Sequence, residues 1–333
     1  MADCPIAVSV GDPSGIGPDI ILKAWKNRNA SEDLPDFFVA GSIKSLSERS
    51  DLLGLNTEFT AFDSSAKISK DKLSVLDIGQ SVTGSPGKPS LGDASGTTAA
   101  IDMAVSAVID GLASAVVTCP INKHVLYEGG FKHPGHTEYL GELAQRHTGK
   151  RYKPVMMLAG PELRTVPVTI HIPLCDVPAE LTGESIMETT MIVSADLQKR
   201  FDISQPRIAI AGLNPHAGEN GDIGREEIEF IAPAVAALRK QNIDVRGPLP
   251  ADTMFHAAAR KTYDVAICMY HDQALIPAKM LGFDDAVNVT LGLPFIRTSP
   301  DHGTAYDIAG TGSANPSSFV AALKMAAEMA ECT

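Results

Sequence analysis

Histidine side chains follow several apolar runs of this 333-residue sequence, where those runs end. His171, His216 and His271 each occupy such a position, among turn-forming residues. Strand ends are where α/β proteins place reactive groups, and three imidazoles can hold one divalent metal with a position left for substrate. No short H-x-x-x-H spacing accompanies them, and a single loop histidine is more often only a hydrogen-bonded polar side chain. The pattern alone therefore favours the plainer interpretation and keeps metal binding as an alternative.

The segment 270–307 holds the residue types best suited to bind an anion. It contains Lys279, Asn288, Arg297, Asp301 and His302 among Gly, Pro and Thr. An arginine side chain offers paired N–H donors to a phosphate or carboxylate, and a lysine adds a mobile charge. The net charge of −12 argues against a nucleic-acid or acidic-membrane surface, so an anionic substrate needs a local cluster of this kind. A solvated loop with structural ion pairs explains the segment equally well.

Two further loops carry polar or flexible residues after apolar runs. GDPSGIGP, residues 11–18, is not a G-x-G-x-x-G or a G-x-x-x-x-G-K-[ST] motif. It suits either close approach of a ligand to the backbone beside a helix or a tight connection, and the pattern favours the connection. In TCPINK, Lys123 can reach an anion, cap a helix or face water; we favour one of the last two roles.

Apolar runs alternate with helical patterns along the whole chain. The expected strands are 6–10, 115–119, 155–159, 165–170, 207–213, 266–270 and 286–290. The expected helices are 19–25, 96–112, 179–200, 226–241 and 317–330, and the long loop is 80–93. This alternation indicates an α/β fold with largely parallel, buried strands.

Composition limits the class of protein. Hydrophobic residues make up 44% and charged residues 20%, which is ordinary for a globular chain, and the length suggests two domains. Five scattered cysteines without a C-x-x-C pair indicate free thiols in a reducing compartment. The N-terminus has no signal-peptide pattern, and no apolar run approaches the roughly 18 residues of a membrane span. We therefore expect a cytoplasmic protein that binds neither membranes nor nucleic acid.

Eight motifs together resemble one family. In order they are GDPSGIGP, TCPINK, PGHTEYL, TIHIPL, GLNPHAGENGDIGREE, GPLPADTMF, MYHDQALIPAK and VNVTLGLPFIRTSPDHGTA. This set resembles the 4-hydroxythreonine-4-phosphate dehydrogenase family of vitamin B6 biosynthesis. The resemblance implies an isocitrate/isopropylmalate dehydrogenase-like α/β fold, with two α/β/α lobes around a cleft, and not a classical Rossmann fold. It divides the chain into residues 1–128 plus 300–333 and a second lobe, 129–299, that carries most of the site.

The resemblance also implies the site residues. The divalent-metal ligands fall on His171, His216 and His271. The substrate contacts fall on His136, Thr137, Lys279, Asn288 and Arg297, and Lys279 is the candidate general base. The implied cofactors are NAD or NADP and one divalent metal per subunit, either zinc, cobalt, manganese or magnesium. The implied assembly is a homodimer whose subunits share the metal ligands.

The implied reaction is oxidation of 4-phosphohydroxy-L-threonine at C3, followed by decarboxylation to 3-amino-2-oxopropyl phosphate. A paralogous dehydrogenase acting on 4-phospho-D-threonate or 4-phospho-D-erythronate is the nearest alternative, because it shares most of the motifs. An acyltransferase of related fold is a more distant alternative, and it needs neither the three histidines nor a nicotinamide cofactor.

Overall fold

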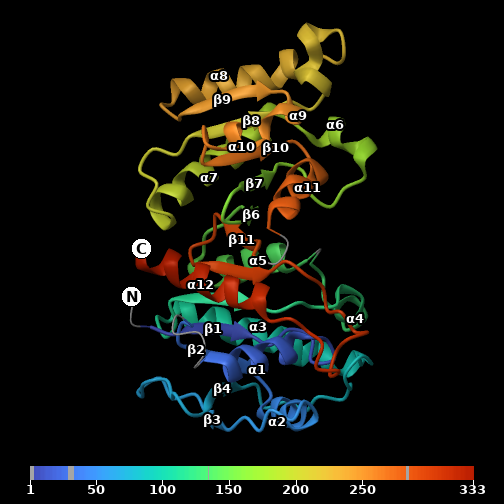
Figure 1. Ribbon diagram of the computed structural model, residues 1–333, viewed down its shortest axis with the longest axis vertical. Helices are drawn as coiled ribbons and strands as arrows, with labels where there is room; N and C mark the ends of the chain where they lie inside the picture. Colours follow the sequence, from blue (N-terminus) through green and yellow to red (C-terminus); the bar gives the residue numbers. More distant parts are fainter. Residues whose placement is uncertain (1–3, 29–33, 134, 283–284) are drawn as a thin grey trace. The chain divides into compact units, whose positions relative to one another are not determined.

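The structure is a computed structural model that describes residues 4–28, 34–133, 135–282 and 285–333 (Figure 1). By its packing the chain divides into two compact units, each built of strands and helices: unit 1 comprises Met1–Pro154 and Leu293–Glu331, and unit 2 comprises Val155–Gly292. The expected α/β fold class is therefore confirmed. Residues 129–154 and 293–299 pack with unit 1, although the division from sequence assigned them to the second lobe.

Two elements explain why these segments belong to unit 1. The helix α5 (His136–Thr148) packs against α3 (Ala94–Ile109). The strand β12 (Arg297–Pro300) pairs in parallel with β5 (Ala115–Thr118). β12 has the sequence RTSP and is completely buried, although three of its four residues are polar or charged. Sequence analysis missed this strand because it has no apolar run.

Unit 1 contains a parallel sheet with the strand order β3-β4-β2-β1-β5-β12. Its remaining strands are β1 (Ile6–Ser9), β2 (Phe37–Gly41), β3 (Phe59–Ala61) and β4 (Leu73–Asp77). All the recorded pairings in this sheet are parallel, and β1 lies between β2 and β5. The carboxyl ends of these strands therefore meet at one edge of the sheet, and the parallel pairing agrees with the sequence prediction.

Helices cover this sheet. They are α1 (Gly17–Asn27), α2 (Ile43–Leu52), α3, α4 (Lys123–Glu128), α5 and α12 (Ser317–Glu331), with a short 3-10 turn η2 (Leu91–Asp93). α3 packs on β1 and β2, and α12 packs on β12 and β5. Pro18 lies in the first turn of α1, where its missing N–H has no intrahelical role.

Unit 2 contains a mixed sheet with the order β11-β6-β7-β10-β8-β9. Its strands are β6 (Val155–Ala159), β7 (Arg164–Pro167), β8 (Ile208–Ala211), β9 (Val245–Leu249), β10 (Val265–Cys268) and β11 (Val287–Leu291). β7, β10, β8 and β9 pair in parallel, whereas β6 is antiparallel to both β7 and β11. The expectation of parallel strands fails at β6 because only residues 160–163 join it to β7, too few for a crossover.

Unit 2 contains six α-helices among its described residues. They are α6 (Val177–Glu180), α7 (Gly183–Arg200), α8 (Ala232–Lys240), α9 (Ala251–Met254), α10 (Ala257–Arg260) and α11 (His271–Leu281). Three short turns complete the unit: η3 (Leu174–Asp176), η4 (Pro215–Gly221) and the π-helical η5 (Glu227–Ile231). Thr182 caps α7 in a reciprocal capping box with Ser185, which separates it from α6.

The cysteines and the apolar character of the helices complete the description of the fold. All five cysteines are free, as the sequence predicted, and Cys119 and Cys268 are completely buried. Within the described ranges, no helix combines the length and the apolar character that a membrane crossing requires.

Candidate active site

Two of the three candidate metal ligands lie side by side in unit 2. The rings of His171 and His271 have centroids 5.7 Å apart and planes inclined by 44°. His271 is the first residue of α11, and its Nδ1 lies 2.7 Å from Oδ1 of Asp272. Both rings line a pocket of about 260 Å³, together with apolar side chains that include Ile172 and Leu174. The expected convergence of these two strand ends is therefore present.

Hydrogen bonds between the strand ends place these histidines. Thr169, two residues before His171, donates through Oγ1 to the carbonyl oxygen of Met269 at 2.7 Å. The N–H of Val168 donates to the carbonyl oxygen of Cys268 at 2.8 Å. Because these contacts continue the β7–β10 pairing beyond the strands, the segments that carry His171 and His271 leave the sheet together.

The third candidate ligand, His216, lies in an unusual loop. Residues 216–220 all have positive φ, between 44° and 79°, and only one of them is glycine. The left-handed conformation costs a non-glycine residue about 1–2 kcal/mol, so surrounding contacts must hold this turn. The side chain of His216 is 63% exposed, and its Nδ1 lies 3.5 Å from Oε2 of Glu219.

The metal-ligand prediction is thus only partly realised within one chain. Among the residues that the structure describes, no group of three His, Cys, Asp or Glu side chains is close enough to hold a metal ion. His171 and His271 fit as two imidazole ligands beside an open pocket, a donor type that zinc, cobalt and manganese accept. His216 is not grouped with them.

In unit 1, β5, α5 and β12 bring together the residues suited to bind an anion. Arg297 is only 3% exposed, and both its Nε and its Nη2 donate to Oγ1 of Thr118, at 3.1 and 2.7 Å. Burial lowers the pKa of Arg297 to about 10, so the side chain remains a cation at neutral pH. Thr118 ends β5 and was not singled out from the sequence, because a threonine at a strand end gives no signal of its own.

His136, the first residue of α5, lies near this arginine. The residue is partly exposed, but its Nε2 atom is buried and has no hydrogen-bond partner among the described residues. Burial, together with the charges of Arg297 and Lys123, holds the pKa of His136 well below its ordinary value. The ring is therefore neutral at physiological pH and has a nitrogen available for a ligand.

The amino end of α5 adds a favourable field for an anion. Its N-cap is Gly135, which has no side chain to accept from the N–H groups of the first turn, and Thr137 lies in that turn. A Cβ atom on Gly135 would stand 3.5 Å from Nζ of Lys123 and 3.2 Å from Oε2 of Glu138. Lys123 therefore lies beside the residues suited to bind an anion, a location that the sequence analysis did not favour.

The remaining two candidates belong to unit 2. Lys279 lies half-buried in the last turn of α11, and Asn288 lies half-buried on β11. Oδ1 of Asn288 is buried, with no hydrogen-bond partner among the described residues. A buried amide oxygen without a donor is costly, so it indicates a site for a water or a ligand donor.

The GDPSGIGP loop is a structural junction. The N–H of Asp12 donates to the carbonyl of Pro120, and that of Ile16 donates to the carbonyl of Thr304, both at 2.9 Å. The N–H groups of Ser14 and Gly15 donate to oxygens of Asp12 itself, at 2.8 and 3.1 Å. Because these donors are occupied, the loop is not a phosphate cradle, in agreement with the interpretation that the sequence favoured.

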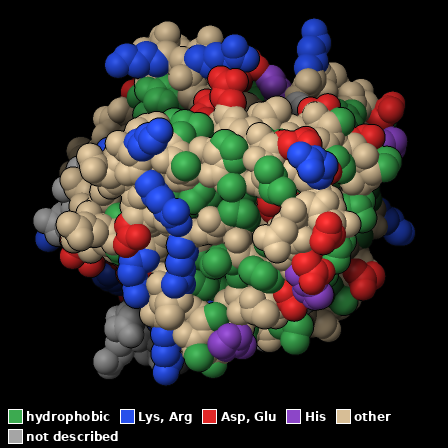
Figure 2. All heavy atoms as spheres, turned by 90° about the horizontal axis from the view of Figure 1, so that it is seen from above, with side chains coloured by type: hydrophobic (Ala, Val, Ile, Leu, Met, Phe, Trp, Pro, Cys, Tyr) green, Lys and Arg blue, Asp and Glu red, His purple; other side chains and the backbone are tan. Residues whose placement is uncertain are grey.

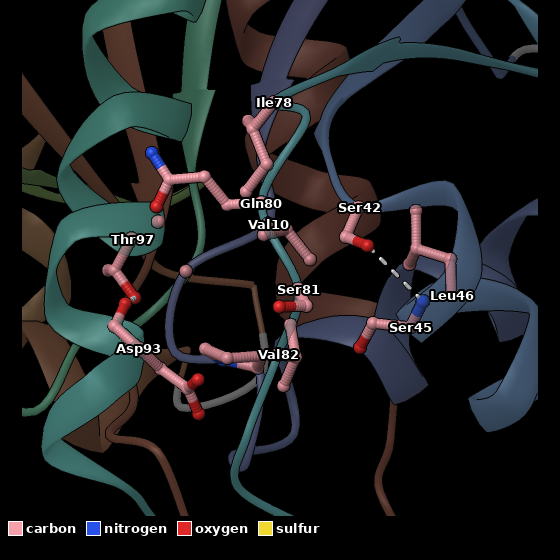
Figure 3. Close-up of a pocket in the computed structure, with 13 residues that line it drawn as sticks. Val10, Ser42, Ser45, Leu46, Ile78, Gln80, Ser81, Val82, Asp93 and Thr97 are labelled. Atoms are coloured by element: carbon pink, nitrogen blue, oxygen red, sulfur yellow. Dashed lines mark hydrogen bonds between the residues drawn. The ribbon is translucent and has the colours of Figure 1, made fainter.

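A second pocket, in unit 1, lies beside this loop (Figure 3). Val10, Leu46, Ile78 and Val82 give it an apolar wall, and the Asp93 side chain points toward the loop in the close-up. The cavity is about 20 Å³, room for one water molecule. None of the candidate site residues lines it.

The charged surface is uneven. Figure 2 shows Lys and Arg side chains gathered mainly along one side of the face in view, with apolar side chains between them and the Asp and Glu side chains. The net charge of −12 therefore leaves room for locally positive regions, as an anionic substrate requires.

This arrangement defines the class of protein: an α/β protein with a buried arginine beside a neutral histidine in one unit and a histidine pair in the other. Its fold is shared with the solved 4-hydroxythreonine-4-phosphate dehydrogenase from Klebsiella pneumoniae, with a TM-score of 0.87, 38% identity and coverage of 98% of this chain and 99% of that chain.

The family follows from the sequence comparisons. Residues 33–326 match the family model described as pyridoxal phosphate biosynthetic protein PdxA, and the chain belongs to this family. The chain is 52% identical to the 4-hydroxythreonine-4-phosphate dehydrogenase of Bradyrhizobium diazoefficiens, covering 98% of this chain and 97% of the relative. It is 50% identical to the corresponding protein of Xanthobacter autotrophicus, with 99% and 95% covered. The family resemblance inferred from the eight motifs is confirmed.

Proposed function

We propose that this protein is a nicotinamide-dependent dehydrogenase that oxidises 4-phosphohydroxy-L-threonine at C3 in pyridoxal phosphate biosynthesis. The observation that carries the proposal is the match along nearly the whole chain, at 52% identity, to a relative named for the phosphorylated hydroxythreonine. The product of the oxidation is a β-keto acid, and its loss of CO₂ gives 3-amino-2-oxopropyl phosphate.

Five residues bind the substrate in this proposal. His136, Thr137 and Arg297 supply a neutral imidazole, a helix amino end and a buried guanidinium, which suit a phosphate or carboxylate. Lys279 and Asn288 of unit 2 supply an amino group and a buried amide oxygen. Contacts of this kind present C3 of the substrate for hydride transfer.

His171, His216 and His271 are the proposed ligands of one divalent metal, either zinc, cobalt, manganese or magnesium. When bound, such a metal lowers the pKa of a hydroxyl group that it coordinates. His171 and His271 pair within the chain and His216 does not, which fits a site completed across a homodimer. The exposed apolar side chains of Ile172 and Leu174, beside the histidine pair, are the kind of surface that a partner subunit covers.

The chain's own groups must also move a proton. Lys279 is the proposed general base that takes the proton of the C3 hydroxyl. The hydride leaves C3 for NAD or NADP, and C3 becomes a ketone. The cationic groups around the substrate then stabilise the negative charge that develops as the carboxylate is lost. We propose a cytoplasmic location, since five free cysteines suit a reducing compartment.

The test is NADH formation with purified protein and two substrates in parallel, 4-phosphohydroxy-L-threonine and 4-phospho-D-threonate, each with and without a chelator. Turnover of the first substrate alone, abolished by the chelator and restored by added metal, is the expected result. Turnover of the second alone would move the protein to the paralogous activity on phosphorylated sugar acids. Absence of NADH with both, together with acyl-phosphate turnover, would replace the proposal with the acyltransferase alternative.

A further inference from the structure

The loop that carries His216 is held in place by hydrogen bonds to a buried carboxylate. Glu227 is 3% exposed and lies at the start of the π-helical turn η5. Its Oε1 accepts from the backbone N–H groups of Leu213 and Asn214, both at 2.8 Å, and its Oε2 accepts from Nδ2 of Asn214 at 2.9 Å. One side chain therefore fixes the entry to the left-handed turn at residues 216–220.

Two glycines of this loop lie against the same carboxylate. A Cβ atom on Gly212 would stand 3.0 Å from Oε1 of Glu227, and one on Gly218 would stand 2.6 Å from Oε2. Gly218 also has φ +79°, a conformation that favours glycine. The backbone thus wraps around the carboxylate on both sides. In the sequence GLNPHAGENGDIGREE, Gly212 and Gly218 therefore make room for Glu227, and the Glu227 carboxylate holds the start of the turn.

Glu227 can affect the candidate site through the His216 loop without contacting the substrate. Loops in strained conformations persist only where other contacts determine them, and such strain is found mainly where a side chain must be presented in one place. His216 is one of the exposed residues that this turn presents, and its side chain is 63% exposed. The conformation of the turn therefore decides where the His216 side chain is presented.

We propose that Glu227 is a positioning residue that preorganises the His216 loop for metal binding. The proposal rests on the proposed function, since it takes His216 as a metal ligand. Glu227→Gln is the informative change, because the amide NH₂ would face Nδ2 of Asn214, a donor whose second hydrogen is already directed to Oε2 of Glu226 at 2.7 Å. The matched control is Glu229→Gln, on the same turn, which removes only an exposed ion pair with Arg225.

The experiment is a double-mutant cycle on metal affinity, measured by chelator competition with Zn²⁺ alone and with Co²⁺ as a spectroscopic probe. We expect Glu227→Gln to weaken Zn²⁺ binding about 10-fold or more and to change the Co²⁺ spectrum, with Glu229→Gln unchanged. In a His216→Ala background the Glu227→Gln change should add almost nothing, since the residue acts through His216. An equal loss in both backgrounds, or no loss in either, would overturn the proposal.

Hydrogen exchange of the metal-free protein separates this proposal from the metal assignment. Glu227→Gln should speed exchange of the Leu213 and Asn214 amides and leave the β6–β7 hairpin unchanged; unchanged exchange at both amides contradicts the positioning role. If His216→Ala leaves Zn²⁺ affinity intact, the metal assignment fails, and these amides still decide whether Glu227 orders the loop. Should Glu227→Gln not fold, Gly218→Ala disturbs the same contact from the other side and should give the same selective loss of Zn²⁺ affinity.

Discussion

The side chain of Gln273 joins the loop that leads to His216 to the segment that leads to His271. Its Nε2 donates to the carbonyl oxygen of Gly212 at 2.8 Å, and its Oε1 accepts from the N–H of Met269 at 2.7 Å. Gly212 follows β8 and Met269 follows β10. The side-chain amide of Gln273 therefore links the ends of two strands, and each of these ends leads to a candidate metal ligand.

Replacing Gln273 with Leu should destabilise the protein. The change leaves the carbonyl of Gly212 and the N–H of Met269 buried without partners, at a cost of about 1–3 kcal/mol for each group unless water enters. Urea unfolding of Gln273→Leu beside Gln241→Leu, an exposed glutamine at the end of α8, measures the difference. A loss below about 0.5 kcal/mol, the range of ordinary surface substitutions, would show that the link carries no stability.

The Arg297–Thr118 contact should control substrate affinity. Arg297→Lys removes the forked guanidinium but keeps a charge, so we expect kcat/KM for the phosphorylated substrate to fall about 10-fold or more, mainly through KM. Thr118→Val removes the oxygen that both Nε and Nη2 share and should have a smaller effect of the same kind. Steady-state kinetics with the exposed Arg151→Lys as control provide the test. A pure loss of kcat would assign Arg297 to the chemical step instead of binding.

His136 should make the folded state sensitive to acid. Burial holds its pKa below the ordinary value, so the unfolded chain binds the proton more readily than the folded chain. Its contribution is therefore fully present above about pH 6.5 and is lost as the pH falls from there toward the lowered pKa of the folded state. Unfolding free energies of the wild type and His136→Gln, measured between neutral and mildly acidic pH, should show a steeper decline for the wild type. Parallel curves would contradict the lowered pKa.

Breaking the buried Arg49–Asp19 ion pair of unit 1 should strongly destabilise the folded protein. Arg49 and Asp19 have side chains only 4% and 0% exposed, and Arg49 also donates to the carbonyls of Gly15 and Pro13, at 3.0 and 2.9 Å. Arg49→Met leaves the Asp19 carboxylate buried without its counter-ion, a change that typically costs about 3–5 kcal/mol.

The exposed pair Lys44–Glu48 provides the control for this prediction. Nζ of Lys44 lies 3.9 Å from Oε1 of Glu48. Lys44→Met should therefore lower the free energy of unfolding by less than about 0.5 kcal/mol. Adding Asp19→Asn to Arg49→Met should restore part of the lost stability, because the unpaired charge is removed. Equal losses for Arg49→Met and Lys44→Met in urea unfolding would show that burial does not strengthen the pair.

Several elements escaped prediction for identifiable reasons. α11 contains Pro277, which interrupts a helical pattern, and its first residue is His271, which we had placed in a loop. α5 has apolar residues at Tyr139, Leu140 and Leu143 and ends at Gly149 in the left-handed conformation, a signal that sequence analysis could have used. The helix expected over 226–241 begins instead as a π-helical turn, and the first residue of that turn, Glu227, is directed toward the His216 loop.

The sequence by itself determined the alternation of strands and helices, the family and the residue types at the strand ends. These are local properties: periodicity, turn residues and motif order need no knowledge of what packs where. Only the tertiary structure decided that His171 and His271 meet while His216 stands apart, that β6 runs antiparallel, and that the polar strand beginning at Arg297 is buried. Strand pairing and burial join residues far apart in the chain, so no spacing within the sequence specifies them.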